Sequence, residues 1–184
     1  MNARHIFIAA SCLALNLTLA KVAALLALPV YLDSIGTILA ATLLPPILAI
    51  AVGVLTSLLG GVFINPYFAA YAGTQLFIAL AAVAFVKIGF FERWWKAVIA
   101  GFGIAATAVI VSAPVTVLLF GGVTLSGTTA INAILLASGR TLWQSVIGGS
   151  VVIESIDKPC AALLSWLVLQ RLPRRLMGRE IDKK

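Results

Sequence analysis

Charged side chains are rare in this chain, and four of them stand in two short stretches where they could contact a ligand. Asp33 lies in YLDSIGTILA, and Glu154, Asp157 and Lys158 lie in ESIDKP. Carboxylates and an ammonium group can hold the polar substituents of a small molecule through charge-assisted hydrogen bonds. Glu154 and Lys158 are four residues apart in the favourable order, so on a continuous helix they would pair with each other.

The two aspartates also have a structural interpretation. Asp33 precedes a helix-like run, so its carboxylate could cap a helix by accepting the backbone N–H of Ile35 or Gly36. Asp157 could cap a final helix in the same way, because Pro159 suits the first turn of a helix. Capping and ligand contact are compatible, and the sequence leaves both interpretations open.

A second polar stretch, NPYFAAYAGTQ (residues 65–75), offers amide and phenol groups. Asn65 begins an Asn-Pro turn, and Tyr67 and Tyr71 could be interfacial aromatic residues that anchor a helix end. Tyr71 and Gln75 are four residues apart and therefore share one helical face. Because the amide of Gln75 lies within an apolar segment, we predict that it hydrogen-bonds a ligand, with Asn65, Tyr67 and Tyr71 beside it.

Arg140, Trp143 and Gln144 form a third candidate group. A cation, an indole and an amide about one helical turn apart can stack on a ring and bind its polar substituents. The alternative is an amphipathic surface helix whose arginine reaches the lipid headgroups and whose tryptophan marks the membrane interface. Both interpretations stay open at the level of the sequence.

The elements that position these residues must be membrane helices. Hydrophobic residues make up 62% of the chain and charged residues 10%, and the mean hydropathy is +1.12, which excludes an ordinary soluble domain. Lipid offers the backbone no hydrogen-bond partners, and the alternation typical of barrel strands is absent, so helices are expected. Residues 1–184 are therefore predicted to be a single all-α integral membrane domain.

Apolar stretches of about 17 to 25 residues can each cross a bilayer. We expect residues 128–152, which contain Arg140, to stay on the outer side as a surface-lying or re-entrant helical segment. A competing count fuses residues 31–58 into one helix and lets 128–152 span the membrane. The preferred count predicts six transmembrane helices, at about residues 5–28, 30–44, 46–63, 68–91, 97–120 and 157–173.

Three basic clusters predict the orientation of the chain. Arg4, the group Lys87, Arg93 and Lys96, and the tail from 171 to 184 should share the cytoplasmic side. Both termini would then be cytoplasmic, and the candidate polar residues would gather on the outer side. A charged group near the bilayer centre costs about 2.5–3.5 kcal/mol, so such residues tend to face a partner or a wet cavity.

The order of five stretches resembles a known family of transport proteins. The stretches are LPVYLDSIGTILAATLLPP, GGVFINPYFAAYAGTQ, FFERWWKAVIAG, FGGVTLSGT and ESIDKPCAALLSWLVLQRLPRRL. Over nearly the full length, they look like the substrate-binding S component of energy-coupling factor (ECF) vitamin transporters. The likeness lies in architecture more than in strict motifs.

This resemblance implies a six-helix protein that captures a vitamin or related heterocyclic precursor in a pocket on the outer face of a bacterial or archaeal cytoplasmic membrane. It also implies a transmembrane coupling subunit and two cytoplasmic ATPases as partners. Ala10 and Ala14 have the small-xxx-small spacing that brings helices close together. This pattern resembles the surface that S components present to their coupling subunit, and ordinary packing within the protein is the alternative interpretation. The chain contains no G-x-x-x-x-G-K-[ST] loop, so ATP hydrolysis is expected in partner subunits.

Other functions find less support in the sequence. Neither Cys12 nor Cys160 stands at metal-ligand spacing, and no nucleophile–base pair is evident, so we expect no metal, no cofactor and no catalysis. The basic tail fits anionic lipid better than nucleic acid. A multi-pass membrane sensor or signalling input domain is the alternative function, because such modules have similar hydropathy.

Overall fold

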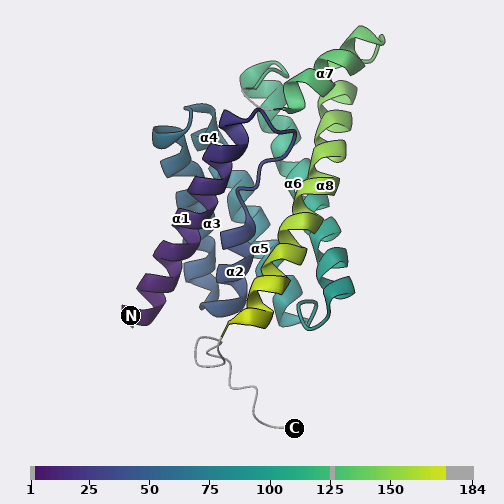
Figure 1. Ribbon diagram of the computed structural model, residues 1–184. Helices are drawn as coiled ribbons and strands as arrows, with labels where there is room; N and C mark the ends of the chain where they lie inside the picture. Colours follow the sequence, from purple (N-terminus) through teal and green to yellow (C-terminus); the bar gives the residue numbers. More distant parts are fainter. Residues whose placement is uncertain (1–2, 125–126, 173–184) are drawn as a thin grey trace.

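The computed structural model describes residues 3–124 and 127–172 of the chain. Every regular element in these two ranges is a helix, which confirms the predicted all-α class. Figure 1 shows the long helices side by side in one bundle, with α7 at the end where α1 finishes and α8 starts. In chain order the helices are α1 (Ala3–Leu25), α2 (Ile35–Leu43), α3 (Pro46–Phe63), α4 (Tyr67–Ala70), α5 (Ala72–Lys87), α6 (Trp94–Phe120), α7 (Thr128–Ala137) and α8 (Leu142–Arg171).

Three helices, α1, α3 and α6, are long and apolar enough to cross a membrane. Helices α2 and α5 are shorter, with 9 and 16 residues. Helix α8 has 30 residues, but every 18-residue window within it includes Glu154, Asp157 and Lys158. The apolar helices agree with a membrane-embedded protein, and the count of six spans stays a prediction.

The predicted second span, residues 30–44, is helical only in its second part. Helix α2 begins at Ile35, and residues 26–34 lie outside any helix. Pro29 lacks an N–H and disfavours a helical backbone in the residue before it. Leu32 has φ +54, in the left-handed region that non-glycine residues rarely adopt. Figure 1 shows this segment leading from the end of α1 back along the bundle to the start of α2.

The helix boundaries in the C-terminal half differ from the predicted ones. The expected single outer segment 128–152 does not form one helix, because it divides into α7 and the first part of α8. Gly139, at φ +86, forms the turn after α7, and a capping box between Thr141 and Gln144 starts α8. Helix α8 then continues through Pro159, so the predicted span 157–173 is the second part of a longer helix.

Proline also defines the boundary between α2 and α3. Pro45 stands between them and Pro46 begins α3, so the single helix over 31–58 of the competing count does not form. The predicted span 46–63 coincides with α3. The predicted span 68–91 is interrupted at Tyr71, which separates α4 from α5.

The segments that carry the basic clusters lie at one end of the bundle. Figure 1 shows the start of α1, the α5–α6 connection and the end of α8 at the same end, opposite α7. A groove there is lined by His5, Pro45 and Lys87 among others. This arrangement agrees with an even number of crossings between the basic clusters. Residues 173–184 of the basic tail lie outside the described residues.

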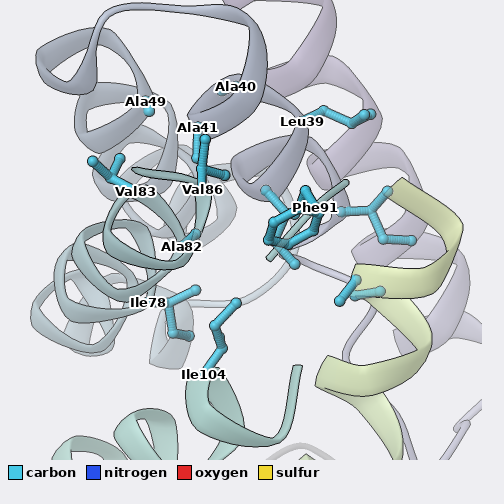
Figure 2. Packing of buried hydrophobic residues seen from close by; sticks show 14 of the residues in the cluster. Leu39, Ala40, Ala41, Ala49, Ile78, Ala82, Val83, Val86, Phe91 and Ile104 are labelled. Atoms are coloured by element: carbon cyan, nitrogen blue, oxygen red, sulfur yellow. The ribbon is translucent and has the colours of Figure 1, made fainter. Parts of the chain in front are cut away.

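The apolar core lies between α2, α5 and α6 and the adjoining faces of α1, α3 and α8. Figure 2 shows Leu39 and Ala41 of α2, Ile78 of α5, Ile104 of α6 and Phe91 of the α5–α6 connection within this core. Many core positions are alanine, and small residues allow helices to approach closely. Ile78 also lines a cavity, so the core adjoins that cavity.

Asn16 connects the first three helices at a fully buried position. Its Nδ2 donates to Thr37 Oγ1 at 2.9 Å and to Thr56 Oγ1 at 3.0 Å, and its Oδ1 accepts the backbone N–H of Gly36 at 2.6 Å. Because unpaired polar groups are costly in lipid and in a protein interior, such a satisfied amide holds helices together. Asn16, rather than Asp33, therefore accepts the Gly36 N–H at the start of α2.

Gly101 of α6 lies directly against Pro159 of α8. A Cβ at this position would lie 2.4 Å from the Cα of Pro159, a backbone atom that cannot move alone. We therefore expect Gly101→Ala to separate the two helices and to lower the free energy of unfolding by about 1–3 kcal/mol. The measurement is the thermal unfolding midpoint of the purified protein in detergent.

Gly73 of α5 provides the control, because a Cβ there meets no atom within 4 Å. Alanine at an open helical position is neutral or stabilises by up to about 1 kcal/mol. Equal melting of Gly101→Ala and Gly73→Ala would show that α6 and α8 do not approach as closely as described.

Candidate ligand-binding site

A cavity opens in the half of the bundle where α4 and α7 lie. The empty space within it, counted together with the open space at its mouth, is about 690 Å³. Its lining comes from α3 to α8 and from the non-helical segment before α2. The lining residues are mostly polar or aromatic: Tyr31, Asp33, Ser57, Asn65, Tyr67, Phe68, Tyr71, Thr74, Gln75, Ile78, Ser112, Thr116, Thr124, Thr128, Ser150, Glu154 and Lys158.

Lys158 lies at the centre of a cluster of carboxylates beside this cavity. Its Nζ is 2.6 Å from Asp157 Oδ2, 3.2 Å from Glu154 Oε2 and 3.3 Å from Asp33 Oδ1. The Lys158 side chain is 1% exposed, and Asp33, at 15%, is the most exposed of the three acidic partners. The cluster joins α8 to the segment before α2, and it confirms that Glu154 and Lys158 pair on a continuous helix.

Asp157 holds the non-helical segment against α8. Its Oδ1 accepts the backbone N–H of Tyr31 at 3.0 Å and that of Leu32 at 2.9 Å. Irregular backbone within a membrane protein is tolerated where its polar groups are satisfied by protein or line a cavity. Here both conditions hold, since Tyr31 and Asp33 face the cavity while the carboxylate satisfies the backbone behind them.

Helices α5 and α6 form another part of the cavity lining. The hydroxyl groups of Tyr71 and Thr116 are 2.8 Å apart, which connects the start of α5 to α6. Gln75 Nε2 donates to the carbonyl oxygen of Asp33 at 3.4 Å. This bond orients the Gln75 amide, and its Oε1 is left buried without a hydrogen-bond partner.

Seven of the predicted site residues line the cavity together: Asp33, Asn65, Tyr67, Tyr71, Gln75, Glu154 and Lys158. Asp157 stands behind them, where it contacts Lys158 and the backbone of the non-helical segment. The structure thus brings the YLDSIGTILA, NPYFAAYAGTQ and ESIDKP stretches to one place.

The third predicted group does not reach the cavity. Arg140 is exposed in the α7–α8 turn, and Trp143 is 44% exposed on α8. Gln144 takes part in the capping box, where its Oε1 accepts the Thr141 N–H at 3.2 Å. This placement favours the surface-helix interpretation for Arg140, Trp143 and Gln144.

Both capping interpretations of the aspartates are wrong. Ser34 occupies the N-cap position of α2 without a capping side-chain hydrogen bond, and the Asp33 carboxylate pairs with Lys158 instead. Asp157 lies well inside α8, whose cap is Thr141.

Sequence reasoning missed a set of hydroxyl-bearing residues in the lining. Tyr31 stands two residues before Asp33, and its ring centroid is 5.4 Å from Lys158 Nζ. Ser112 and Thr116 are one helical turn apart in the otherwise apolar α6, and both face the cavity. This i, i+4 spacing was a usable signal, since two hydroxyls on one face of an apolar helix indicate a polar neighbour.

The arrangement can bind a small molecule and orient it. Aromatic rings, amide and hydroxyl groups and a charged cluster converge on one partly enclosed space, as is typical of ligand pockets. Among the described residues, no group of three or more His, Cys, Asp or Glu could hold a metal ion. Comparison of the chain with protein-family models, with curated proteins and with solved structures finds no match.

Proposed function

We propose that this chain is a membrane-embedded binding protein that captures a small heterocyclic molecule in the cavity lined by helices α3 to α8 and the segment before α2. The observation that carries the proposal is the polar lining of one cavity in an otherwise apolar helical bundle. Buried polar groups are normally hydrogen-bonded, yet Gln75 Oε1 and Asn65 Oδ1 lack a partner there. A bound ligand would supply those hydrogen bonds.

The proposed role is the substrate-capture S subunit of an ECF-type importer for a vitamin or related precursor. Four of the five stretches that resemble this family supply cavity residues, which include Asp33, Asn65 and Gln75, Thr124 and Thr128, and Glu154 with Lys158. In this role the cavity faces the outside of a bacterial or archaeal cytoplasmic membrane. The termini lie in the cytoplasm, and a coupling subunit and two ATPases deliver the ligand inward.

Ligand binding is tested by dialysis of the purified protein against a complex metabolite extract, followed by mass spectrometry of the enriched compounds. We expect the wild-type protein to enrich one small heterocycle. Gln75→Ala should weaken this enrichment about 5- to 100-fold, because it removes a buried hydrogen-bonding amide from the cavity wall.

Arg140→Gln serves as the matched control and should retain the wild-type enrichment, because Arg140 is exposed outside the cavity. Enrichment that falls in Arg140→Gln but persists in Gln75→Ala would place the binding site elsewhere. The absence of any enriched compound would contradict a binding function.

The proposed partners are tested by co-purification from the native host. Ala10 and Ala14 are both exposed on α1, as a docking surface requires. A tryptophan at Ala14 should abolish recovery of the ATPases without lowering ligand enrichment. Recovery of ATPases in equal yield with Ala14→Trp would move the docking surface elsewhere, and their absence from the wild-type preparation would favour a sensor.

A further inference from the structure

The charges beside the cavity do not balance. Three carboxylates, those of Asp33, Glu154 and Asp157, surround the single ammonium group of Lys158. Lys158 is the only basic residue among the described residues that line the cavity. The cluster therefore carries two formal negative charges in excess.

Asp157 is the carboxylate that Lys158 neutralises most directly. It makes the shortest contact, at 2.6 Å, and is fully buried. Its second oxygen is taken by two backbone N–H groups. Asp157 does not line the cavity, so its bonding is complete without a ligand.

Asp33 and Glu154 are left to share the same ammonium group, and both line the cavity. Glu154 Oε2 is 3.2 Å from Lys158 Nζ, within ion-pair distance, but its geometry does not make a hydrogen bond. A carboxylate that is 5% exposed and lacks a hydrogen-bond donor is costly to bury. The excess negative charge therefore faces the space that a ligand would occupy.

Neutral acceptors elsewhere in the lining are unpaired as well. Gln75 is 2% exposed, and because its Nε2 donates to the Asp33 carbonyl, the free Oε1 is the acceptor rather than the donor end of the amide. Asn65 Oδ1 is also buried without a partner. A ligand that satisfies these atoms must donate hydrogen bonds.

Aromatic rings complete the surroundings. Tyr31, Tyr67, Phe68 and Tyr71 line the cavity, and the Tyr31 ring already has the Lys158 ammonium 5.4 Å from its centroid. The faces of such rings attract cations and stack on planar rings. A metal ion bound by the three carboxylates would have to occupy the position that the Lys158 ammonium already takes.

We infer that the ligand is a small planar organic cation with N–H donors, whose charged group lies against Asp33 and Glu154 and whose donors reach Gln75 Oε1. This inference rests on the proposed binding function and names the chemical class of its ligand. Anionic heterocycles are excluded, because the one ammonium group in the described lining, that of Lys158, already pairs with three carboxylates.

The test uses three probes of nearly the same shape: benzamidinium, which is cationic, benzamide, which is neutral, and benzoate, which is anionic. Their affinities for the purified full-length protein in detergent are measured by saturation-transfer NMR titration at neutral pH. Benzamidinium should bind about tenfold or more tightly than either of the others, since charge-assisted hydrogen bonds are roughly twice as strong as neutral ones.

Glu154→Gln and, separately, Asp33→Asn should remove most of this preference, because each variant should weaken benzamidinium binding far more than benzamide binding. Glu92→Gln is the control, because Glu92 is exposed in the α5–α6 connection and pairs only with Lys96 in the described part of the chain. Asp33 is partly exposed, so its variant keeps the test valid if Glu154→Gln folds poorly.

Equal or tighter binding of benzamide or benzoate would overturn the inference, as would a preference that persists in both carboxylate variants. Failure of all three probes to bind would also reject a planar cation as the ligand class. The metabolite-enrichment experiment does not depend on ligand charge, so it decides the proposed binding function separately.

Discussion

The Lys158→Met variant is expected to be less stable than the wild-type protein by about 3–5 kcal/mol, the usual effect of removing one partner from a buried ion pair. Methionine fills a similar volume, so the effect isolates the charge. Without the ammonium group, Asp33, Glu154 and Asp157 would repel one another in a space with little water. The measurement is the unfolding midpoint of the purified protein in detergent at neutral pH.

Lys96→Met is the matched control for this prediction. The Lys96 side chain is 29% exposed and pairs at 3.7 Å with Glu92, whose side chain is 71% exposed. Such exposed pairs contribute about 0–1 kcal/mol. If the two lysine variants melt at the same temperature, the carboxylates are not held together by Lys158.

A double variant separates electrostatics from packing. Asp157→Asn removes the closest negative charge, so it should partly rescue Lys158→Met. The double variant would then be more stable than the sum of the single effects predicts. Additive effects would mean that Asp157 and Lys158 do not interact.

The second large loss of stability is expected for Asp157→Ala. This change removes the acceptor of the Tyr31 and Leu32 N–H groups as well as the nearest counter-charge of Lys158. Each unpaired buried donor costs about 1–3 kcal/mol, so the loss of stability should approach that of Lys158→Met. Hydrogen exchange at the amides of Tyr31 and Leu32 should also accelerate.

Asp157→Asn is informative here too, because its side-chain oxygen can still accept the two backbone N–H groups. Exchange at Tyr31 and Leu32 should therefore be slower in Asp157→Asn than in Asp157→Ala. Unchanged exchange in Asp157→Ala would show that this carboxylate does not hold the segment.

The local contacts of the site could be predicted from sequence spacing. The pairing of Glu154 with Lys158 follows from their separation of four residues, and it is present at 3.2 Å. The common placement of Tyr71 and Gln75 on one wall follows in the same way. Such contacts depend only on the geometry of one helix.

Contacts between residues far apart in the chain could not be predicted from the sequence. The bonds from Asp157 to Tyr31 and Leu32 join residues 126 and 125 positions apart, and no local pattern marks them. The aspartates were therefore considered as helix caps, a role that local sequence can suggest. Asn16 was overlooked for the same reason, since its partners Thr37 and Thr56 lie 21 and 40 positions away.

The boundaries of α8 were misjudged because local signals favoured a break in the helix. Arg140 suggested an outer segment over 128–152, and Asp157 with Pro159 resembled the start of a final span. In the structure, Lys158 pairs with both Glu154 and Asp157 inside the bundle, and the helix continues through all three residues. Hydropathy alone cannot show that a charged residue already has its partner.

Cysteine labelling shows directly whether the cavity opens to the outside of the cell and whether a ligand closes it. A single cysteine is placed at Ser112, which lines the cavity, after Cys12 and Cys160 are replaced by alanine. Intact cells are treated with an impermeant cationic thiol reagent, with and without the compound enriched by the wild-type protein. We expect labelling from outside that the compound slows. Labelling only from the cytoplasm would show that the cavity does not open outward, and a rate that saturating compound leaves unchanged would show that the cavity does not hold the compound.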